Sequence, residues 1–375
     1  MKSTVRGKKI LYLMHVPWGW IKQRPHFIAE QLSERYHVEV FFTQSFRKIQ
    51  LVRNEIAGNV EVRRLLLLPY GRMKIISAIN SFLVALQLRI KDYDYVWFTS
   101  PLLFKLLNKY IPATTKVIYD CMDDATEFQF AKTHPRFLTQ LQTYEGRLLE
   151  RSDTVFTSSE YLKKKLSASY QFSSNVTVIN NAISLNNTER NTLLGESESL
   201  PFEIEERFKN ARFRITYIGT ISDWMDFELI IESVEKFQEI TYFFIGPAEV
   251  KIPMHERIFH FGPIEHKYVS SVLQSSDVLV MPFKLNELVL SVNPVKLYEY
   301  IYANKPTISV KYNETLQFED YVYLYKNKEE YFSILQRIID NDFPCKKSDE
   351  ENKRFAKMNS WEERIETIIN KIESR

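Results

Sequence analysis

Short apolar runs alternate with segments of helical periodicity along the whole chain, and this alternation leaves few folds open. In the first half the runs lie at 8–14, 37–42, 60–67, 94–100, 116–120, 153–158 and 176–180, and in the second half at 212–219, 240–246, 257–262, 277–282, 306–310 and 322–325. Runs that are apolar on both faces are typical of parallel strands covered by helices. The pattern predicts an α/β fold of two Rossmann-like, doubly wound domains.

The length of 375 residues also favours two domains, because single domains usually hold about 100–200 residues. A polar stretch of low periodicity, residues 180–208, separates the two groups of apolar runs. We expect domains at 1–185 and 186–355, followed by a terminal helix at 356–375 in which Ser360 precedes Trp361 as a helix cap.

Several classes of protein are disfavoured by composition. Two cysteines are too few for a disulfide framework, and the seven histidines show no metal-ligand spacing, so we expect no protein-held metal and a reducing compartment. No apolar run reaches the roughly 20 residues of a membrane span. The basic and then apolar N-terminus is interpreted as a first buried strand, because its apolar run is short and no cleavage site follows.

The charge is unevenly divided between the two halves. Residues 1–185 hold 26 Lys and Arg against 15 Asp and Glu, a net +11, and residues 186–375 hold 24 against 32, a net −8, which together give +3. A basic half can meet nucleic acid, an anionic membrane surface or an acidic neighbouring domain. No nucleic-acid-binding motif accompanies it, so we expect no nucleic-acid partner.

Two turns after strands carry candidate polar groups in the first half. In VPWGWIKQRPHF, Gly19 permits a tight turn, and Lys22 and Arg24 precede a helix that begins near Pro25. The two cations either hold a phosphate or carboxylate at the helix N-terminus or are merely solvated.

The second turn, YDCMDDATEFQ, gathers Asp120, Asp123 and Asp124 at a strand end. Neighbouring carboxylates raise one another's pKa and can act as a general base. The alternatives are capping of the next helix and a weak Mg²⁺ site.

The second half places glycine at the end of successive strands, at Gly219, Gly246 and Gly262. Glycine lets backbone amides approach a ligand closely. The stretch SVNPVKLYEYIYANKP follows, in which Pro294 suits the first position of a helix. The free amides after it and Lys296 form an anion site, and Glu299, one turn on, can accept hydrogen bonds from a ribose diol. The alternative is a solvated Lys–Glu pair.

The order of these motifs resembles the GT-B glycosyltransferases of family 4, in particular those of bacterial surface polysaccharides and the teichuronic-acid type. Pro294 to Glu299 and the following YIYANKP look like the family's P-x-x-x-x-E-A-x-A-x-G-x-P. The resemblance implies two domains that face a cleft, with the helix at Trp361 crossing back to the N-terminal domain. WGWIKQRPHFIAEQL looks like the loop and first helix of the acceptor domain.

The resemblance implies roles residue by residue. It makes Glu299 the ribose ligand and the amides near Lys296 the diphosphate ligands. The donor-binding set it implies is Gly219, Thr220, Gly246, Pro247, Gly262, Pro263, Ser291, Asn293, Pro294, Val295, Lys296, Leu297 and Glu299. The acceptor-side set is Gly19, Trp20, Arg24 and Asp124, and the catalytic residues are Asp123 and Lys296.

Three departures from the family pattern stand out. Ser291 replaces the first glutamate, Thr220 to Trp224 lack the usual Arg/Lys pair, and Met122-Asp123 stands in place of His-Asp. Lys296 and Arg24 are then expected to supply the positive charge. Retention is favoured by the family, while an aspartate base also resembles inverting relatives, so the stereochemistry stays open.

The expected function is that of a metal-independent hexosyltransferase without a cofactor. It moves a sugar from a nucleotide donor, with UDP favoured, to a glycan or lipid-linked acceptor in cell-surface polysaccharide synthesis. A nucleotide-sugar epimerase and a non-catalytic binding module are the alternatives. The expected location is the cytoplasm, with residues 63–91 as either a cationic amphipathic face on the inner membrane leaflet or a core-packed helix with solvated Arg and Lys.

Overall fold

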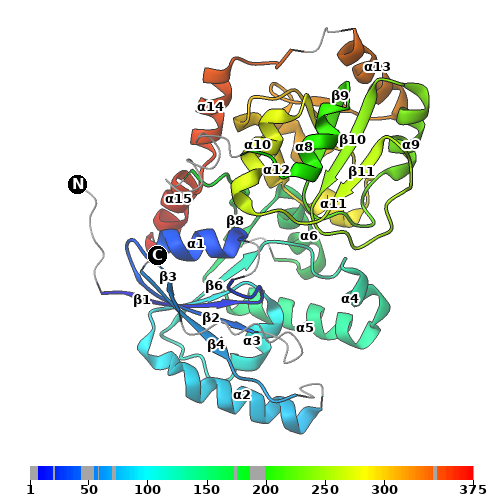
Figure 1. The fold of residues 1–375 in the computed structure, drawn as a ribbon. Helices are drawn as coiled ribbons and strands as arrows, with labels where there is room; N and C mark the ends of the chain where they lie inside the picture. Colours follow the sequence, from blue (N-terminus) through cyan, green and yellow to red (C-terminus); the bar gives the residue numbers. More distant parts are fainter. Residues whose placement is uncertain are drawn as a thin grey trace. The chain divides into compact units, whose positions relative to one another are not determined.

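The computed structural model describes residues 7–19, 22–43, 55–57, 59–69, 73–172, 175–185, 199–340 and 344–374. The chain divides into two compact units, unit 1 with Met1–Asn181 and Trp361–Arg375, and unit 2 with Ala182–Ser360. The division falls four residues before the boundary that we expected at 185. Each unit is built around one sheet (Figure 1).

Unit 1 contains a sheet in the order β3-β4-β2-β1-β5-β6-β7-β8. Its strands are β1 (Lys9–Met14), β2 (His37–Thr43), β3 (Glu55–Ala57), β4 (Val60–Leu65), β5 (Tyr95–Phe98), β6 (Lys116–Cys121), β7 (Thr154–Thr157) and β8 (Val176–Val178). All neighbours pair in parallel except β3 with β4. The apolar runs of the first half therefore form the parallel sheet that they predict, and the short antiparallel edge strand β3 was not foreseen.

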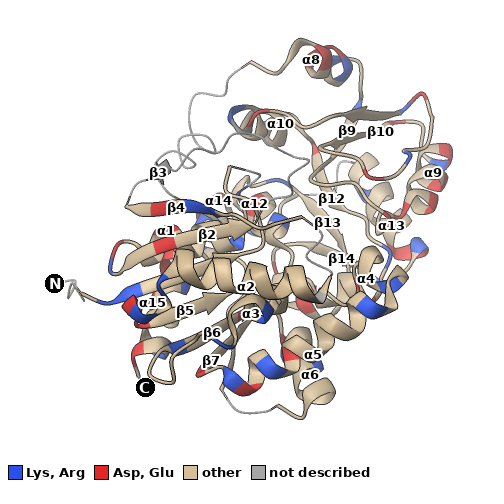
Figure 2. Ribbon diagram, turned by 90° about the horizontal axis from the view of Figure 1, so that it is seen from below, with Lys and Arg blue, Asp and Glu red and all other residues tan. Residues whose placement is uncertain are grey.

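Helices cover both faces of this sheet. They are α1 (Arg24–Leu32), α2 (Lys74–Leu88), η1 (Ile90–Asp92), α3 (Pro101–Leu107), α4 (Gln129–Thr133), α5 (Pro135–Arg151), α6 (Glu160–Tyr170) and α15 (Trp361–Glu373). Leucines and valines of α2, α3, α5 and α6 share one apolar cluster with the strands, so these four helices cover the same face, part of which is seen in Figure 2.

The C-terminal helix α15 packs against α1 in unit 1 (Figure 1). Its apolar residues recur at helical spacing, at Trp361, Ile365, Ile368, Ile369 and Ile372, and all are buried. The ring of Trp361 stacks on Phe27 of α1, with centroids 5.7 Å apart. The return of the last helix to the N-terminal part of the chain is thus as expected.

Unit 2 contains a wholly parallel sheet in the order β11-β10-β9-β12-β13-β14. Its strands are β9 (Phe213–Ile218), β10 (Ile240–Ile245), β11 (Ile258–Phe261), β12 (Val278–Met281), β13 (Thr307–Val310) and β14 (Tyr323–Tyr325). Its helices are α8 (Phe202–Lys209), α9 (Phe227–Lys236), η2 (His266–Tyr268), α10 (Val269–Ser275), α11 (Glu287–Ser291), α12 (Val295–Tyr302), η3 (Asn313–Phe318), α13 (Lys328–Ile339) and α14 (Asp349–Met358).

The single terminal helix expected at 356–375 is two helices. Ser348 caps α14 by accepting from the Glu351 amide at 3.3 Å, and Glu351 returns a bond to the Ser348 amide at 3.0 Å. The chain then breaks at Asn359 and Ser360 before α15 begins. The end of α14 belongs to unit 2, so residues 356–360 are not part of the same unit as the last helix. Among the described residues, no helix is both long and apolar enough to cross a bilayer.

Candidate functional site

The strand order of unit 2 places a topological switch point between β9 and β12. From β9 the chain proceeds outward through β10 and β11, and it then returns to the other side of β9 as β12, followed by β13 and β14. Ligands of open parallel sheets bind beyond the carboxyl ends of the strands at such a point. A ligand site in unit 2 is therefore expected at the turns after β9, β10, β11 and β12.

Two of the predicted glycines, Gly219 and Gly246, end β9 and β10 in close mutual contact. Their φ angles are 155° and 138°, which side chains rarely adopt, and a Cβ on Gly246 would lie 2.1 Å from the Gly219 carbonyl oxygen. Tyr217 Oη donates to the Thr220 carbonyl at 2.9 Å, and the Ile221 amide donates to the Pro247 carbonyl at 2.9 Å. The two turns form one rigid platform.

Gly262 and Pro263, after β11, differ from this pair. A Cβ on Gly262 would meet no atom within 4 Å, and Pro263 is exposed. The neighbouring His260 lies with Nε2 2.9 Å from the Gly246 carbonyl oxygen, which ties β11 to the turn after β10. Gly262 therefore borders open space, and its lack of a side chain is not required by packing.

Helix α12 begins one residue later than the sequence predicts. Pro294 is the N-cap, with φ −80° and ψ 98°, and Val295 is the first helical residue. The Leu297 amide donates to the Pro294 carbonyl at 3.1 Å. The amides of Val295 and Lys296 belong to the first turn, whose N–H groups have no carbonyl partner within the helix.

Lys296 and Glu299 pair with each other along this helix. Lys296 Nζ lies 2.9 Å from Glu299 Oε2, and both side chains are about one-third exposed or less. A cation and a carboxylate are thus held together beside the first turn of α12. Both groups are partly open to solvent, as the proposed ligand roles require.

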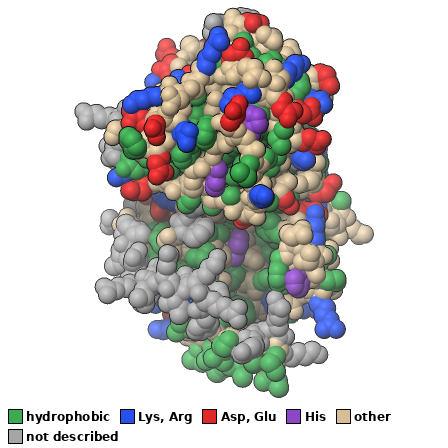
Figure 3. Space-filling model, turned by 45° about the vertical axis from the view of Figure 1, so that its right-hand side comes forward, with side chains coloured by type: hydrophobic (Ala, Val, Ile, Leu, Met, Phe, Trp, Pro, Cys, Tyr) green, Lys and Arg blue, Asp and Glu red, His purple; other side chains and the backbone are tan. Residues whose placement is uncertain are grey.

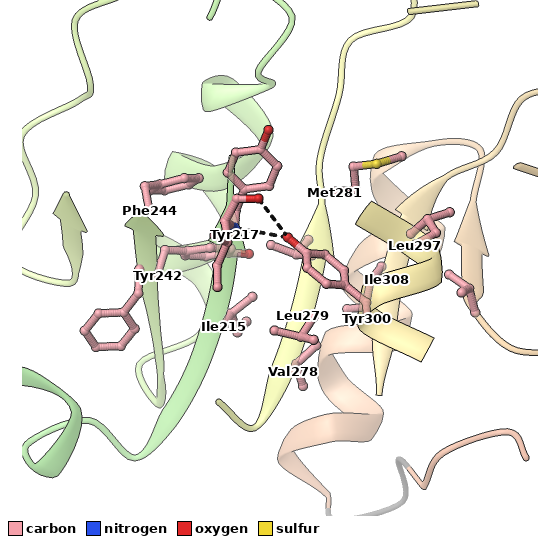
Figure 4. Close-up of a cluster of buried hydrophobic side chains, with 14 of the residues drawn as sticks. Ile215, Tyr217, Tyr242, Phe244, Val278, Leu279, Met281, Leu297, Tyr300 and Ile308 are labelled. Carbon is pink, nitrogen blue, oxygen red and sulfur yellow. Dashed lines mark hydrogen bonds between the residues drawn. The ribbon is translucent and has the colours of Figure 1, made fainter. Parts of the chain in front are cut away.

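Tyr300 fixes this helix to the switch point (Figure 4). The buried Tyr300 hydroxyl accepts the Ile218 amide at 3.0 Å and lies 3.5 Å from the Ile218 carbonyl oxygen. Burial, first of all, raises the pKa of Tyr300 well above its ordinary value, so its hydroxyl stays neutral. Because Ile218 directly precedes Gly219, the Tyr300 contact sets α12 against the glycine platform.

Three other predicted donor residues are committed to the interior of unit 2. Ser291 is buried at the end of α11, and its Oγ donates to the Leu288 carbonyl at 2.7 Å. Asn293 is buried with its Oδ1 3.4 Å from Tyr298 Oη, and Leu297 packs in the hydrophobic core. The side chains of these three residues leave little surface for a ligand.

The turn after β9 is held without the basic pair that the family pattern would place there. Ser222 Oγ donates to Glu249 Oε2 at 2.7 Å, and the Trp224 carbonyl accepts the Lys284 amide at 2.7 Å. The substituted residues therefore connect the turns after β9, β10 and β12.

In unit 1, Arg24 forms a buried pair with Asp120 at the carboxyl end of β6. Arg24 Nη2 lies 2.8 Å from Asp120 Oδ1, and Arg24 Nη1 donates to the Ile179 carbonyl at 2.6 Å. Both side chains are almost fully buried. Our expectation of an Arg24 guanidinium available to a ligand phosphate is not met, because its donors face Asp120 and the backbone near β8.

Asp123 lies in the turn after β6 with a shifted proton affinity. Burial raises the pKa of Asp123 to about 6, Arg24 opposes that rise, and the charges of Asp120 and Asp124 add to it. A carboxylate of this kind is well suited to accept a proton near neutral pH.

Asp124, next to it, holds the turn together. Asp124 is buried and pairs with Lys165, and it accepts from the Thr126 hydroxyl at 2.6 Å. Lys165 also contacts Glu127 at 3.2 Å. Asp124 is thus a structural anchor for the turn that carries Asp123.

His15 follows β1 at the same sheet edge and was not predicted as a site residue from the sequence. His15 is exposed, and its Nδ1 lies 2.8 Å from Thr99 Oγ1 at the end of the neighbouring strand β5. Thr99 Oγ1 also accepts from the His15 amide at 3.1 Å and donates to the Leu13 carbonyl at 3.3 Å, so Thr99 holds both the backbone and the ring of His15 at this edge. The position of His15 directly after a strand was the signal available in the sequence.

Two predicted residues on the acceptor side, Gly19 and Trp20, follow β1. Gly19 is exposed with φ 85°, as its tight turn requires, and Trp20 lies outside the described residues. Across the described part of the chain, no group of three or more His, Cys, Asp or Glu is arranged to hold a metal ion.

Comparisons with known proteins give one relative by sequence. No family model matches the chain. A curated protein of Bacillus subtilis (strain 168), named "Putative teichuronic acid biosynthesis glycosyltransferase TuaH", is 26% identical over 61% of this chain and 59% of its own length. The chain thus matches less than two thirds of the length of that relative.

Solved structures match over nearly the whole chain. Sucrose-phosphate synthase of Thermosynechococcus elongatus has a TM-score of 0.73 at 12% identity and covers 98% of this chain and 99% of its own. HepE of Anabaena, in complex with UDP-glucose, has a TM-score of 0.68 at 13% identity and covers 98% and 100%. The chain has the GT-B fold, and the resemblance stated from its sequence is confirmed at the level of the fold.

Proposed function

We propose that this protein is a glycosyltransferase that moves a sugar from a nucleotide-sugar donor, with UDP-sugars favoured, to a glycan or lipid-linked acceptor in cell-surface polysaccharide synthesis. The observation that carries the proposal is the Lys296–Glu299 pair on the first turns of α12, which Tyr300 fixes beside the glycine platform. The sequence relative and the fold both support this class of enzyme.

In the proposed donor site the diphosphate lies at the start of α12. The amides of Val295 and Lys296 and the Lys296 ammonium bind its oxygens. When the phosphate takes Lys296, Glu299 loses its partner and its two oxygens become available to a ribose diol. The Lys296–Glu299 ion pair is then the ligand-free state of the site. When the nucleotide binds, Lys296 contacts its diphosphate and Glu299 contacts its ribose.

The chemistry follows from the charge that develops when the sugar–phosphate bond breaks. Negative charge grows on the leaving diphosphate, where the helix amides and Lys296 stabilise it. No step in this scheme needs a bound metal. A UDP-sugar is the first donor to test, because HepE of the same fold is described in complex with UDP-glucose.

In the proposed acceptor site Asp123 is the general base. It takes the proton of the acceptor hydroxyl as that oxygen attacks the anomeric carbon, and its pKa of about 6 leaves it ionised at neutral pH. A single displacement assisted by Asp123 in this way inverts the anomeric carbon. Retention, which the resemblance to family 4 favours, would instead leave the acceptor proton to the departing phosphate. The anomeric configuration of the product distinguishes the two.

The experiment is a donor panel with the purified full chain. UDP-, GDP- and dTDP-sugars are each incubated with the protein, and release of the nucleoside diphosphate is measured with and without an oligosaccharide or polyprenyl-diphosphate-sugar acceptor. Acceptor-stimulated release from one donor supports transfer. Binding of a donor without turnover would favour a non-catalytic module, and conversion of the sugar while it stays on the nucleotide would favour an epimerase.

A further inference from the structure

Helix α2 of unit 1 has apolar side chains on the face that is turned to solvent. Its inner face is formed by Asn80, Val84 and Leu88, which are buried. On the outer face a surface helix usually carries polar residues. Here seven apolar residues of α2 and of the segments just before it are each between 42% and 74% exposed: Leu66, Leu68, Met73, Ile75, Ile79, Phe82 and Leu86. We call this set the α2 surface.

The α2 surface runs along helix α2 and includes the segment that follows strand β4. Residues 75, 79, 82 and 86 recur at helical spacing, so they form a stripe about 16 Å long at roughly 1.5 Å per residue. Figure 3 shows hydrophobic side chains gathered at the lower edge of the view. An exposed apolar patch of this extent marks an interaction site rather than ordinary surface.

The backbone beside the stripe has its polar groups satisfied from within the protein. The Leu68 amide donates to Asn80 Oδ1 at 2.7 Å, and Asn80 Nδ2 donates to the Leu68 carbonyl at 3.1 Å. The Leu66 amide likewise donates to Gln87 Oε1, and Gln87 Nε2 donates to the Leu66 carbonyl, both at 3.3 Å. Two side-chain amides thus pair with the peptide groups of the strand exit, which suits a surrounding that offers no hydrogen bonds.

Basic residues predominate in the segments that flank the stripe, and two of them are paired with acids, Arg63 with Glu61 at 2.9 Å and Arg89 with Asp92. Residues 62–91 contain six Lys and Arg and no Asp or Glu, and α2 carries no acidic residue along its length (Figure 2). Cations follow the helix at Arg89 and Lys91, and the nearest acid is Asp92, which lies 3.2 Å from Arg89 Nε. Two copies of such a face would bring cations against cations, so a second copy of this chain is a poor occupant.

We propose that the α2 surface lies on an anionic lipid bilayer, with its apolar stripe in the boundary between headgroups and acyl chains and its flanking cations on the lipid phosphates. The helix is too short to span and has the apolar face that a helix lying in the interface requires. This deepens the proposed function, since it brings the enzyme to the surface where lipid-linked acceptors reside. The vesicle test below uses neither donor nor acceptor, so either proposal can fail without the other.

The test is flotation of the purified full chain with vesicles of phosphatidylcholine and phosphatidylglycerol, and with phosphatidylcholine vesicles alone. Wild type should float with the mixed vesicles and far less with phosphatidylcholine. Ile75→Ser combined with Phe82→Ser should weaken binding about tenfold or more, because both side chains lose their transfer into the acyl region. Lys91→Gln should weaken it about fivefold, and only on anionic vesicles.

The matched control is Met254→Ser combined with Phe202→Ser, which removes two exposed apolar side chains of unit 2, 92% and 76% exposed. This variant should float like wild type. Thermal unfolding of both double variants should be unchanged, since all four positions are exposed. Hydrogen exchange on vesicles should slow in residues 73–88.

Three results would overturn the proposal. Wild type does not float with either vesicle, or the two double variants float equally. The third is a wild type that sediments as a dimer, becomes a monomer with Ile75→Ser and Phe82→Ser, and does not bind vesicles, which would make the α2 surface a contact between copies.

Discussion

Arg24 Nε donates to both carboxylate oxygens of Asp120 at 3.1 Å, and Arg24 Nη2 reaches Asp120 Oδ1 at 2.8 Å. The pair joins the first residue of α1 to the carboxyl end of β6 inside unit 1. Arg24 Nη1 also reaches the Ile179 carbonyl, just after β8. One guanidinium therefore holds three segments at the sheet edge where Asp123 and His15 emerge.

Removal of one member of this pair should be costly. Asp120→Asn leaves a buried guanidinium without its counter-charge, and we expect a loss of about 3–5 kcal/mol in the free energy of unfolding. Urea denaturation followed by circular dichroism measures it. The double variant Arg24→Met with Asp120→Leu should be more stable than Asp120→Asn alone. Equal stability of wild type and Asp120→Asn would show that the pair does not hold the edge together.

The pH profile of transfer should report Asp123. The ionised carboxylate is the base, and its pKa of about 6 predicts a rate that rises as pH increases through about 6 and then levels. Asp123→Asn should lower kcat about 10²–10⁴-fold at neutral pH and remove this limb. Full activity of Asp123→Asn would show that Asp123 is not the base. His15 would then be the next residue to replace.

The neighbours of Asp123 provide a signed control. Arg24 lowers the pKa of Asp123 and Asp120 raises it. Arg24→Met should therefore move the acidic limb of the profile to higher pH, and Asp120→Asn should move it to lower pH. The measurement is the pH dependence of kcat/KM, at a temperature where both variants remain folded.

Much of the fold was predictable because it rests on local pattern. Short continuous apolar runs rich in β-branched and aromatic residues and followed by glycine, such as ITYFFI, favour buried strands, and that run is the fully buried β10. The edge strand β3 was missed because a three-residue antiparallel strand leaves no periodic signal. The start of α15 at Trp361 agrees with the cap expected at Ser360, whereas the separate helix α14 was not distinguished from the last helix, because its residues have helical periodicity of their own.

The candidate site was predictable only in part, for a physical reason. Motif spacing placed Lys296 and Glu299 on one side of a helix, and the structure has them 2.9 Å apart. Sequence does not tell which partner a charged side chain finds at long range, so the burial of Arg24 against Asp120, 96 residues away, was not foreseen. The same holds for His15, whose partner Thr99 comes from the next strand.

The two members of the α12 pair should respond differently to two ligands. Lys296→Met should weaken binding of both UDP and pyrophosphate, because both present a diphosphate to the ammonium. Glu299→Gln should weaken UDP by about 1.5–3 kcal/mol and leave pyrophosphate little changed, because only UDP carries the ribose. Isothermal titration calorimetry measures each affinity.

A matched control for this pair lies on α14, where Lys353 and Asp349 form another ion pair at 2.6 Å. Lys353→Met should leave both ligands unaffected. If Lys296→Met and Glu299→Gln bind UDP like wild type, the donor site is not at α12, whatever the enzyme proves to transfer.

The two glycine turns of unit 2 separate folding from binding. Gly246→Ala puts a Cβ 2.1 Å from the Gly219 carbonyl oxygen at φ 138°, and we expect it to cost about 2–4 kcal/mol of unfolding free energy through the clash and the strained backbone. Gly262→Ala adds a methyl group where no atom lies within 4 Å, so its stability should stay within about 0.5 kcal/mol of wild type. If Gly262→Ala is as stable as wild type but binds UDP more weakly, the loss of affinity comes from contact between the added methyl group and the ligand. Urea unfolding and calorimetry on the same preparations test both statements, and a stable Gly246→Ala would mean that the two turns do not form a rigid platform.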